Sequence, residues 1–79
     1  MLAGIMSEQI DPNLEKVIDR IAALQAEAKM TNYQLAISSG VTRNVIGRIL
    51  RKTRSLKVET LMKLIDGLGV SPKDFFKTF

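Results

Sequence analysis

The sequence predicts an all-α domain of five helices, and three observations lead to this prediction. Apolar residues recur at spacings of three and four, which is the period of a helix that buries one face. Capping residues and glycines interrupt the chain at short intervals, and no segment shows the alternation typical of strands. A chain of 79 residues, 46% hydrophobic and 25% charged, has the size and composition of one small globular domain.

The first predicted helix covers residues 12 to about 29. Asp11 is a favourable N-cap, and Pro12 suits the first helical position because that position needs no N–H donor. The inward stripe consists of Leu14, Val17, Ile18, Ile21, Leu24 and Ala28. We expect residues 1–11 to form a flexible N-terminal arm and residues 12–79 to form the domain.

A second, short helix is predicted to begin near Asn32. Thr31 and Gln34 have the spacing of a capping box, in which each side chain bonds the backbone N–H of the other residue. Gly40 suits the left-handed position that ends a helix. Val41 is an apolar residue in the resulting tight turn, so we expect it to fill the space between two helices.

Three further helices complete the prediction. Thr42 is a natural N-cap for a helix over residues 42–50, with Val45, Ile46, Ile49 and Leu50 at helical spacing. Residues 51–55 form a basic loop. The fourth helix follows Leu56 and Val58, ends at residues 67–69 and buries Leu61, Leu64, Ile65 and Leu68. The fifth is a short helix that starts at Ser71 and Pro72 and carries Phe75 and Phe76.

Positive charge gathers in the middle of the sequence. Between Ala28 and Val58 there are seven basic residues and no acidic one, whereas the rest of the chain has five basic and eight acidic residues. One strongly positive region on a small domain is typical of proteins that bind a polyanion. The alternative interpretation is an ordinary solvated surface that keeps the protein in solution.

Composition argues against several other functions. The chain has no Cys and no His, so it lacks the usual metal ligands and the commonest catalytic base. We therefore expect no enzyme activity, no cofactor and no metal. No apolar run approaches the roughly 20 residues that a membrane span requires. The apolar first six residues are too short for a signal peptide, which favours a cytoplasmic protein.

The spacing over residues 32–50 is that of a helix-turn-helix. Leu35, Ala36, Val41, Ile46 and Ile49 would hold the second of its helices, residues 42–50, against the core. This arrangement leaves the outer face of that helix free for other contacts, and its residues are Arg43, Asn44, Gly47 and Arg48. The major groove of B-DNA, about 12 Å wide, admits such a helix.

From about Ile21 to Phe76 the sequence resembles the Cro/phage-repressor family of XRE-type helix-turn-helix domains. The resemblance is carried by residues 32–36, 40–43 and 46–49 and by the distal segment 61–71, and it extends over about three quarters of the chain. It implies a compact, five-helix, lambda-repressor-like domain with a central helix-turn-helix. The implied function is sequence-specific binding of double-stranded DNA by a small transcriptional regulator, more often a repressor than an activator.

The resemblance also implies roles for single residues. Arg43, Asn44 and Gly47 match positions that face base edges, and Arg48, which we group with them, could reach a base or a phosphate. The matching phosphate-contact positions are Asn32, Thr42, Arg51, Lys52 and Arg54. Tyr33 is either a further phosphate contact or a half-buried packing residue.

Three positions depart from the family pattern. Family members often have Arg where Gln25 stands and Glu where Leu50 stands, and these two charges form a pair. Because both charges are replaced here, no unpaired buried charge remains and the fold is not put in doubt. Lys52 stands where Gly is common, so the preceding helix could run on past its usual end.

Two kinds of partner are considered. We expect a homodimer that places its two recognition helices, residues 42–50 of each copy, about 34 Å apart on DNA. At most two of Phe75, Phe76 and Phe79 fit a core this small, and the remaining ring either contacts the second copy or frays with the tail. The alternative function is a protein–protein interaction module, such as an antitoxin-like subunit that grips a partner protein through the apolar N-terminal arm and this Phe cluster.

Overall fold

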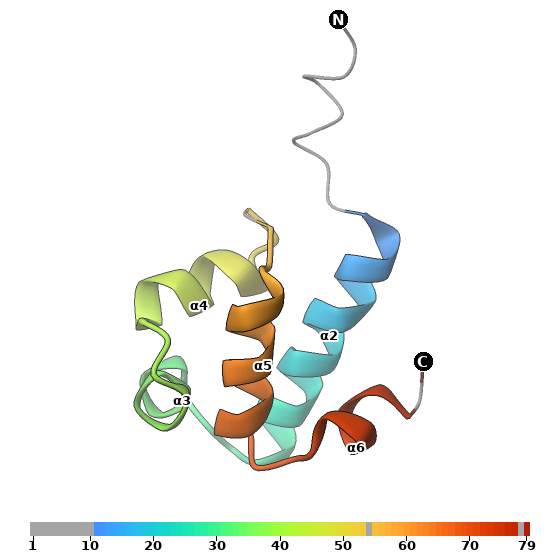
Figure 1. Cartoon of the computed structure of the whole chain (residues 1–79). Coiled ribbons are helices and arrows are strands. Elements are labelled where there is room, and N and C mark those ends of the chain that lie inside the picture. The colour runs from blue at the N-terminus through green and yellow to red at the C-terminus, as the bar shows by residue number, and fades with distance from the viewer. Residues whose placement is uncertain (1–10, 54, 78) are drawn as a thin grey trace, which may run out of the picture.

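The computed structural model describes residues 11–53, 55–77 and 79 (Figure 1). Within these residues it has five helices and no strand, which confirms the all-α prediction. The helices are α2 (Pro12–Glu27), α3 (Asn32–Ser39), α4 (Arg43–Leu50), α5 (Val58–Gly67) and α6 (Pro72–Phe76). The predicted N-terminal arm, except for Asp11, lies outside the described residues. None of the described helices has the length and apolar character needed to cross a bilayer.

Side-chain caps set the starts of α3 and α4, as the sequence predicted. The Thr31 hydroxyl accepts from the Gln34 backbone N–H at 3.1 Å, and the Gln34 side chain accepts from the Thr31 N–H at 2.8 Å. At the start of α4 the Thr42 hydroxyl accepts from the Val45 N–H at 3.3 Å. Each cap satisfies a backbone donor that has no partner inside its helix, so α3 and α4 begin where expected.

The end of α2 differs from the prediction. The helix stops at Glu27, two residues early, and Ala28 is its exposed C-cap rather than a member of the buried stripe. Lys29 has a left-handed backbone, with φ 56°, and the Met30 N–H donates to the Gln25 carbonyl at 3.0 Å. This bond closes the helix end in the way that a C-terminal glycine usually does.

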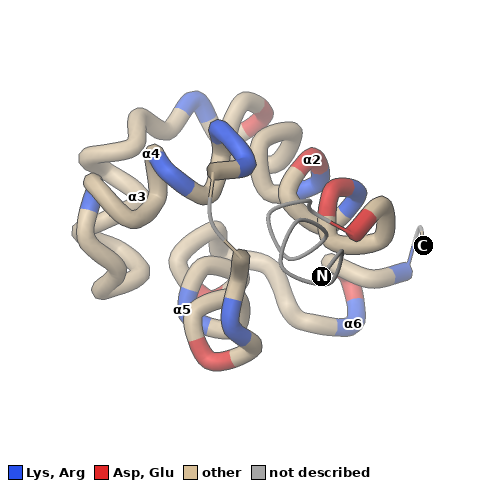
Figure 2. Tube along the Cα trace, turned by 90° about the horizontal axis from the view of Figure 1, so that it is seen from above, with Lys and Arg blue, Asp and Glu red and all other residues tan. Residues whose placement is uncertain are grey.

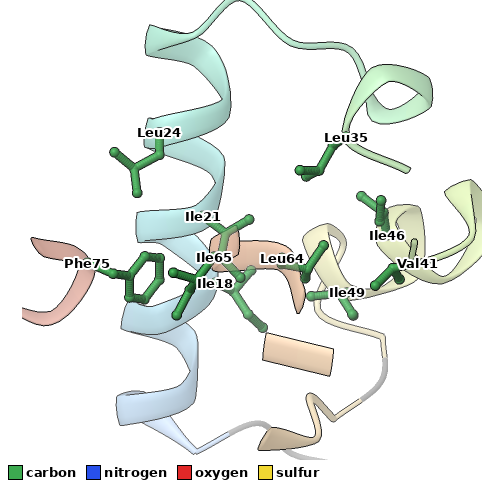
Figure 3. Packing of buried hydrophobic residues seen from close by; sticks show 10 residues of the cluster. All are labelled: Ile18, Ile21, Leu24, Leu35, Val41, Ile46, Ile49, Leu64, Ile65 and Phe75. Atoms are coloured by element: carbon green, nitrogen blue, oxygen red, sulfur yellow. The ribbon is translucent and has the colours of Figure 1, made fainter. Parts of the chain in front are cut away.

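The core lies between α2, α4 and α5, with α3 and α6 covering its two sides (Figure 3). α3 packs on α5 and α4, α2 packs on α4, and α6 packs on α5. Val41 is only 8% exposed, which confirms that the turn residue fills the space between two helices. The buried apolar residues are Ile18, Ile21, Leu24, Leu35, Val41, Ile46, Ile49, Leu64, Ile65 and Phe75.

The C-terminal phenylalanines divide between core and surface. Phe75 is fully buried, whereas Phe76 is 38% and Phe79 is 55% exposed. The Arg20 Nε–H donates to the Phe75 carbonyl at 3.3 Å and so connects α6 to α2. The expectation that one ring stays at the surface is confirmed, and a second ring stays there with it.

α3 and α5 approach each other very closely at Gly67. A Cβ placed on Gly67 would lie 2.6 Å from Cβ and 2.8 Å from Cα of Ser39, closer than real Cβ contacts. The Ser38 hydroxyl donates to the Gly67 carbonyl at 3.0 Å across the same contact. Because α3 and α4 together form the helix-turn-helix, this contact with α5 holds the whole unit on the core.

Candidate nucleic-acid interface

One face of α4 is anchored in the core and the opposite face is open. Ile46 and Ile49 are each 1% exposed, whereas Arg43, Asn44 and Arg48 are exposed. Figure 2 shows basic residues along α4 and just after it, and acidic residues on α2, α5 and α6. A rigid helix thus presents polar and positive side chains, with no carboxylate on the helix itself.

The turn before α4 sets the direction of that helix. Gly40 has φ 79°, and its N–H donates to the Ala36 carbonyl at 2.9 Å. The Val41 N–H donates to the Ser39 hydroxyl at 3.2 Å, and the side chain of Val41 is buried. Backbone bonds and core packing therefore both fix how α4 projects, and Thr42, the exposed N-cap, stands at its leading end.

An open hollow of about 510 Å³ lies between the starts of α3 and α4, and we call it the α3–α4 hollow. Its lining residues are Asn32, Arg43, Asn44, Gly47 and Arg51. All five are base-edge or phosphate-contact candidates of the sequence. Two guanidinium groups and two amides supply N–H donors, and no carboxylate lines the hollow. This chemistry suits an anion or the acceptor-rich edge of a base.

Tyr33 and Arg43 form a contact beside the hollow. The Cζ atom of Arg43 lies 5.7 Å from the centroid of the Tyr33 ring, within the range of a cation–π interaction. Tyr33 is 58% exposed, so its ring packs on a surface guanidinium rather than in the core. The contact links the first turn of α3 to the first turn of α4.

Gly47 lies under the side chain of Arg51. Gly47 is buried, and a Cβ added to it would lie 3.2 Å from Nη1 of Arg51. Side chains of a helix point toward its N-terminus, so Arg51 folds back over the preceding turn where Gly47 leaves room. The family resemblance predicts that Gly47 itself faces base edges, but the structure places the Arg51 guanidinium over it.

Gln25 bonds a residue of the hollow, a role that the sequence pattern did not predict. Its side chain is 7% exposed, and its Nε2 donates to Oδ1 of Asn32 at 2.7 Å. In the sequence, Gln25 stands out only as the replacement for a charged family residue. The available signal was its place beside Ile18 and Ile21 on the buried face of α2, where a polar side chain needs a hydrogen-bond partner.

Lys52 turns away from the hollow. Its ammonium lies 3.0 Å from a carboxylate oxygen of Asp19 and 3.0 Å from one of Glu15, both on α2. Hydrogen bonds to Asp19 and then to Glu15 raise the pKa of Lys52 above 10.5. The family resemblance predicts that Lys52 contacts phosphate, whereas the structure pairs it with α2. Arg54, another expected phosphate contact, lies outside the described residues.

Lys52 also ends α4 in place of the usual glycine. Its φ is 63°, and its backbone N–H donates to the Ile49 carbonyl at 2.9 Å. The helix therefore ends at Leu50 and does not run on. Arg51, the C-cap, keeps helical backbone angles, so it remains on the same face of α4 as Gly47.

Comparisons with known proteins agree with this geometry. The helix-turn-helix family model matches residues 21–75. The crystal structure of the wild-type restriction-modification controller protein C.Esp1396I is 33% identical, with a TM-score of 0.83, covering 87% of this chain and 90% of that chain. A structure of its tetramer in complex with its natural 35 base-pair operator is also 33% identical, with a TM-score of 0.84, covering 87% and 91%. No curated protein sequence matches the chain significantly.

Proposed function

The chain belongs to the helix-turn-helix family of the Cro/C1 type, and from that premise we propose that it binds double-stranded DNA sequence-specifically and regulates transcription. One observation supports this most directly. Arg43, Asn44 and Arg48 are exposed on α4, whose opposite face is buried by Ile46 and Ile49. A helix held from behind, with polar side chains in front, is the arrangement that reads a major groove.

Base reading is assigned to α4. The guanidinium of Arg43 donates to O6 and N7 of a guanine, and the amide of Asn44 pairs with N6 and N7 of an adenine. Arg48 reaches a base edge further along the groove. Gly47 contributes no side chain, and the space that it leaves is used by Arg51 and by the approaching DNA.

Phosphate contacts surround the bases that are read. We assign them to Asn32, Tyr33, Thr42, Arg51 and Arg54, which precede or follow the base-reading face in the sequence. Contacts of this kind fix the register of the protein on DNA and carry no sequence information of their own. Lys52 stays against α2, where its ammonium holds the end of α4 in place.

The protein acts as a homodimer on a palindromic operator. C.Esp1396I, its structural neighbour, was crystallised as a tetramer with operator DNA, which supports assembly on DNA. Two recognition helices about 34 Å apart then enter successive major grooves. Phe76 and Phe79 provide exposed apolar surface for the contact between copies. The dimer represses by occupying DNA, in the cytoplasm, without enzyme activity or a cofactor.

Selection of bound sequences from a random duplex pool tests this proposal. We expect one palindromic motif, whose affinity falls as salt rises because bound phosphates release counterions. For the phosphate contacts assigned above, the slope of log K against log salt should be about −0.9 for each phosphate that the protein neutralises. The variant with both Arg43→Ala and Asn44→Ala is the matched control, since both side chains are exposed. A pool without enrichment, or an affinity that does not respond to salt, would contradict the proposal.

A second candidate function is a protein–protein interaction module such as an antitoxin-like subunit. Val58 and Met62, one turn apart on α5, are 74% and 41% exposed, and Ile37 on α3 is 67% exposed. Mass measurement by light scattering separates the two candidates. If the isolated protein is a dimer that binds the selected duplex without another protein, the regulator is favoured. If it stays monomeric and fails to bind until a co-purifying protein is added, the interaction module is favoured.

A further inference from the structure

We propose that Gln25 is a positioning residue for DNA binding, which holds Oδ1 of Asn32 so that the Asn32 amino group faces a DNA phosphate. The inference rests on the proposed function and adds a residue that does not itself touch DNA. Its basis is one short contact: Nε2 of Gln25 donates to Oδ1 of Asn32 at 2.7 Å. Asn32 in turn lines the α3–α4 hollow.

The direction of this hydrogen bond decides which end of Asn32 faces the hollow. An asparagine side chain has an acceptor oxygen and a donor amino group, and a half-turn of the amide exchanges them. The guanidinium groups of Arg43 and Arg51, which line the same hollow, attract the oxygen. Gln25 opposes that attraction because its Nε2 donates to the Asn32 oxygen from the core side. The amino group is then left to donate into the hollow.

Burial makes Gln25 suited to this task. Its side chain is 7% exposed, so water competes little for the bond and the bond is stronger than one at the surface. Every buried side-chain N or O atom of the described residues has a hydrogen-bond partner. The bond between the two amides is a part-buried polar contact that joins α2 to α3. A donor that is oriented before binding does not lose rotational freedom when the phosphate arrives, which favours affinity.

The chain thereby replaces one internal link of its family by another. The resemblance implies a charged pair at the positions of Gln25 and Leu50, joining α2 to α4. Here Leu50 packs against the core, and Gln25 bonds α3 instead. The same position on α2 thus orients the first residue of the helix-turn-helix rather than the recognition helix.

Two substitutions of Gln25 separate positioning from packing. Gln25→Met keeps a similar volume and removes the donor, so Asn32 is free to turn. Gln25→Glu supplies a carboxylate that only accepts, so the Asn32 amino group turns to it and the oxygen faces the phosphate. Asn32→Ala and the double variant Gln25→Met with Asn32→Ala complete a double-mutant cycle. Thermal denaturation of each variant establishes that binding is measured on folded protein.

The probe is the selected operator duplex, with one phosphate at a time replaced by an uncharged methylphosphonate. The phosphate assigned to Asn32 is the one whose replacement lowers the affinity of the wild type but leaves the affinity of Asn32→Ala unchanged. We expect Gln25→Met to abolish sensitivity at that phosphate alone and to lower affinity about tenfold per subunit. Gln25→Glu should lower it at least as much as Asn32→Ala. The double variant should bind as Asn32→Ala does.

The outcomes are distinguishable. If Gln25→Met keeps the wild-type sensitivity at that phosphate, or weakens all phosphate contacts equally in step with a lower Tm, the positioning role is wrong while DNA binding stands. Additive losses in the double variant also overturn it. If the wild type selects no duplex, the proposed function fails and the phosphate scan has no operator to use.

Discussion

The ammonium of Lys52 lies 3.0 Å from the carboxylate of Asp19, which joins the end of α4 to the middle of α2. The second carboxylate partner, Glu15, lies one turn earlier on α2, also at 3.0 Å. Lys52 reaches these groups from a left-handed backbone conformation, with φ 63°. The side chain thus helps to stabilise a conformation that its own Cβ disfavours.

Replacing Lys52 separates these two effects. Lys52→Ala loses the ion pairs and keeps a Cβ in the left-handed conformation, whereas Lys52→Gly loses the pairs and relieves the backbone. We therefore expect the glycine variant to melt about 4 to 8 °C above the alanine variant. Thermal denaturation at low salt measures the difference. Equal melting temperatures would show that the left-handed backbone at this position carries no cost.

The ion pairs of Lys52 also predict a dependence of stability on pH. Hydrogen bonds to Asp19 and Glu15 raise the pKa of Lys52 above 10.5 in the folded state. Its contribution is therefore fully present below the pKa of the unfolded chain and is lost as pH rises through the folded pKa. The difference in stability between the wild type and Lys52→Met should shrink above about pH 10.5. Denaturant titrations from pH 8 to 12 test this, and a difference that grows with pH would contradict it.

Gly67 is predicted to tolerate no side chain. A Cβ at this position would lie 2.6 Å from Cβ and 2.9 Å from the backbone N of Ser39, so α3 and α5 would have to separate. We expect Gly67→Ala to lower the free energy of unfolding by about 1–3 kcal/mol. Asp66→Ala, at the exposed neighbouring residue, is the control and should have little effect. Chemical denaturation measures the free energy of unfolding of both variants. Similar values would show that α3 and α5 adjust to the extra Cβ without loss of stability.

Gly47 should respond in the opposite way to a small substitution. A Cβ added at this position would first meet Nη1 of Arg51, at 3.2 Å, and this atom is the flexible end of a side chain that can shift. Because alanine favours helix more than glycine does, Gly47→Ala should raise the free energy of unfolding by up to about 1 kcal/mol.

A larger side chain at Gly47 should weaken DNA binding. Gly47→Gln would displace the guanidinium of Arg51 from the α3–α4 hollow, so its DNA affinity should fall as in Arg51→Ala while the fold is kept. Combining Gly47→Gln with Arg51→Ala should then add little to either loss. Titration of the selected duplex measures these affinities. Wild-type affinity for Gly47→Gln would show that the placement of Arg51 is irrelevant to binding.

We expect Arg43 and Asn44 to determine which DNA sequence is preferred, and Arg51 to determine the affinity for DNA in general. Loss of a bidentate base contact costs about 1–3 kcal/mol of discrimination at one base pair. Arg43→Ala and Asn44→Ala should therefore each relax the selected motif at one position per half-site. Arg51→Ala should weaken all duplexes alike and flatten the salt dependence. Competition with base-substituted operators compares the sequence preference of the three variants. If only Arg51→Ala relaxes the motif, Arg51 and not Arg43 or Asn44 determines the preference.

Much of the fold could be predicted from local chemistry. Thr31, Gln34 and Thr42 cap helices through bonds that span three residues, so their sequence spacing is sufficient evidence. Gly40 has the left-handed backbone that its type predicts. The end of α2 was placed two residues late because the left-handed residue there is Lys29, which carries no such signal.

The candidate site was only partly predictable. Helical spacing predicted that Arg43, Asn44 and Arg48 lie on an exposed face of α4, and the structure shows them exposed. The hydrogen-bond and ion-pair partners of Gln25 and Lys52 could not be predicted from the sequence. Gln25 bonds a residue on the next helix, and Lys52 bonds residues more than 30 positions away, which no spacing rule relates.

The sequence by itself determined the helices, their caps and the face that α4 leaves open, because these depend on interactions within a few residues. The tertiary structure alone decided which partners the polar side chains of Lys52 and Gln25 meet. Which groups Lys52 and Gln25 meet, and how closely Ser39 approaches Gly67, depends on the packing of helices that are distant in the chain. Such contacts exist only after α2, α3, α4 and α5 have assembled around their shared core.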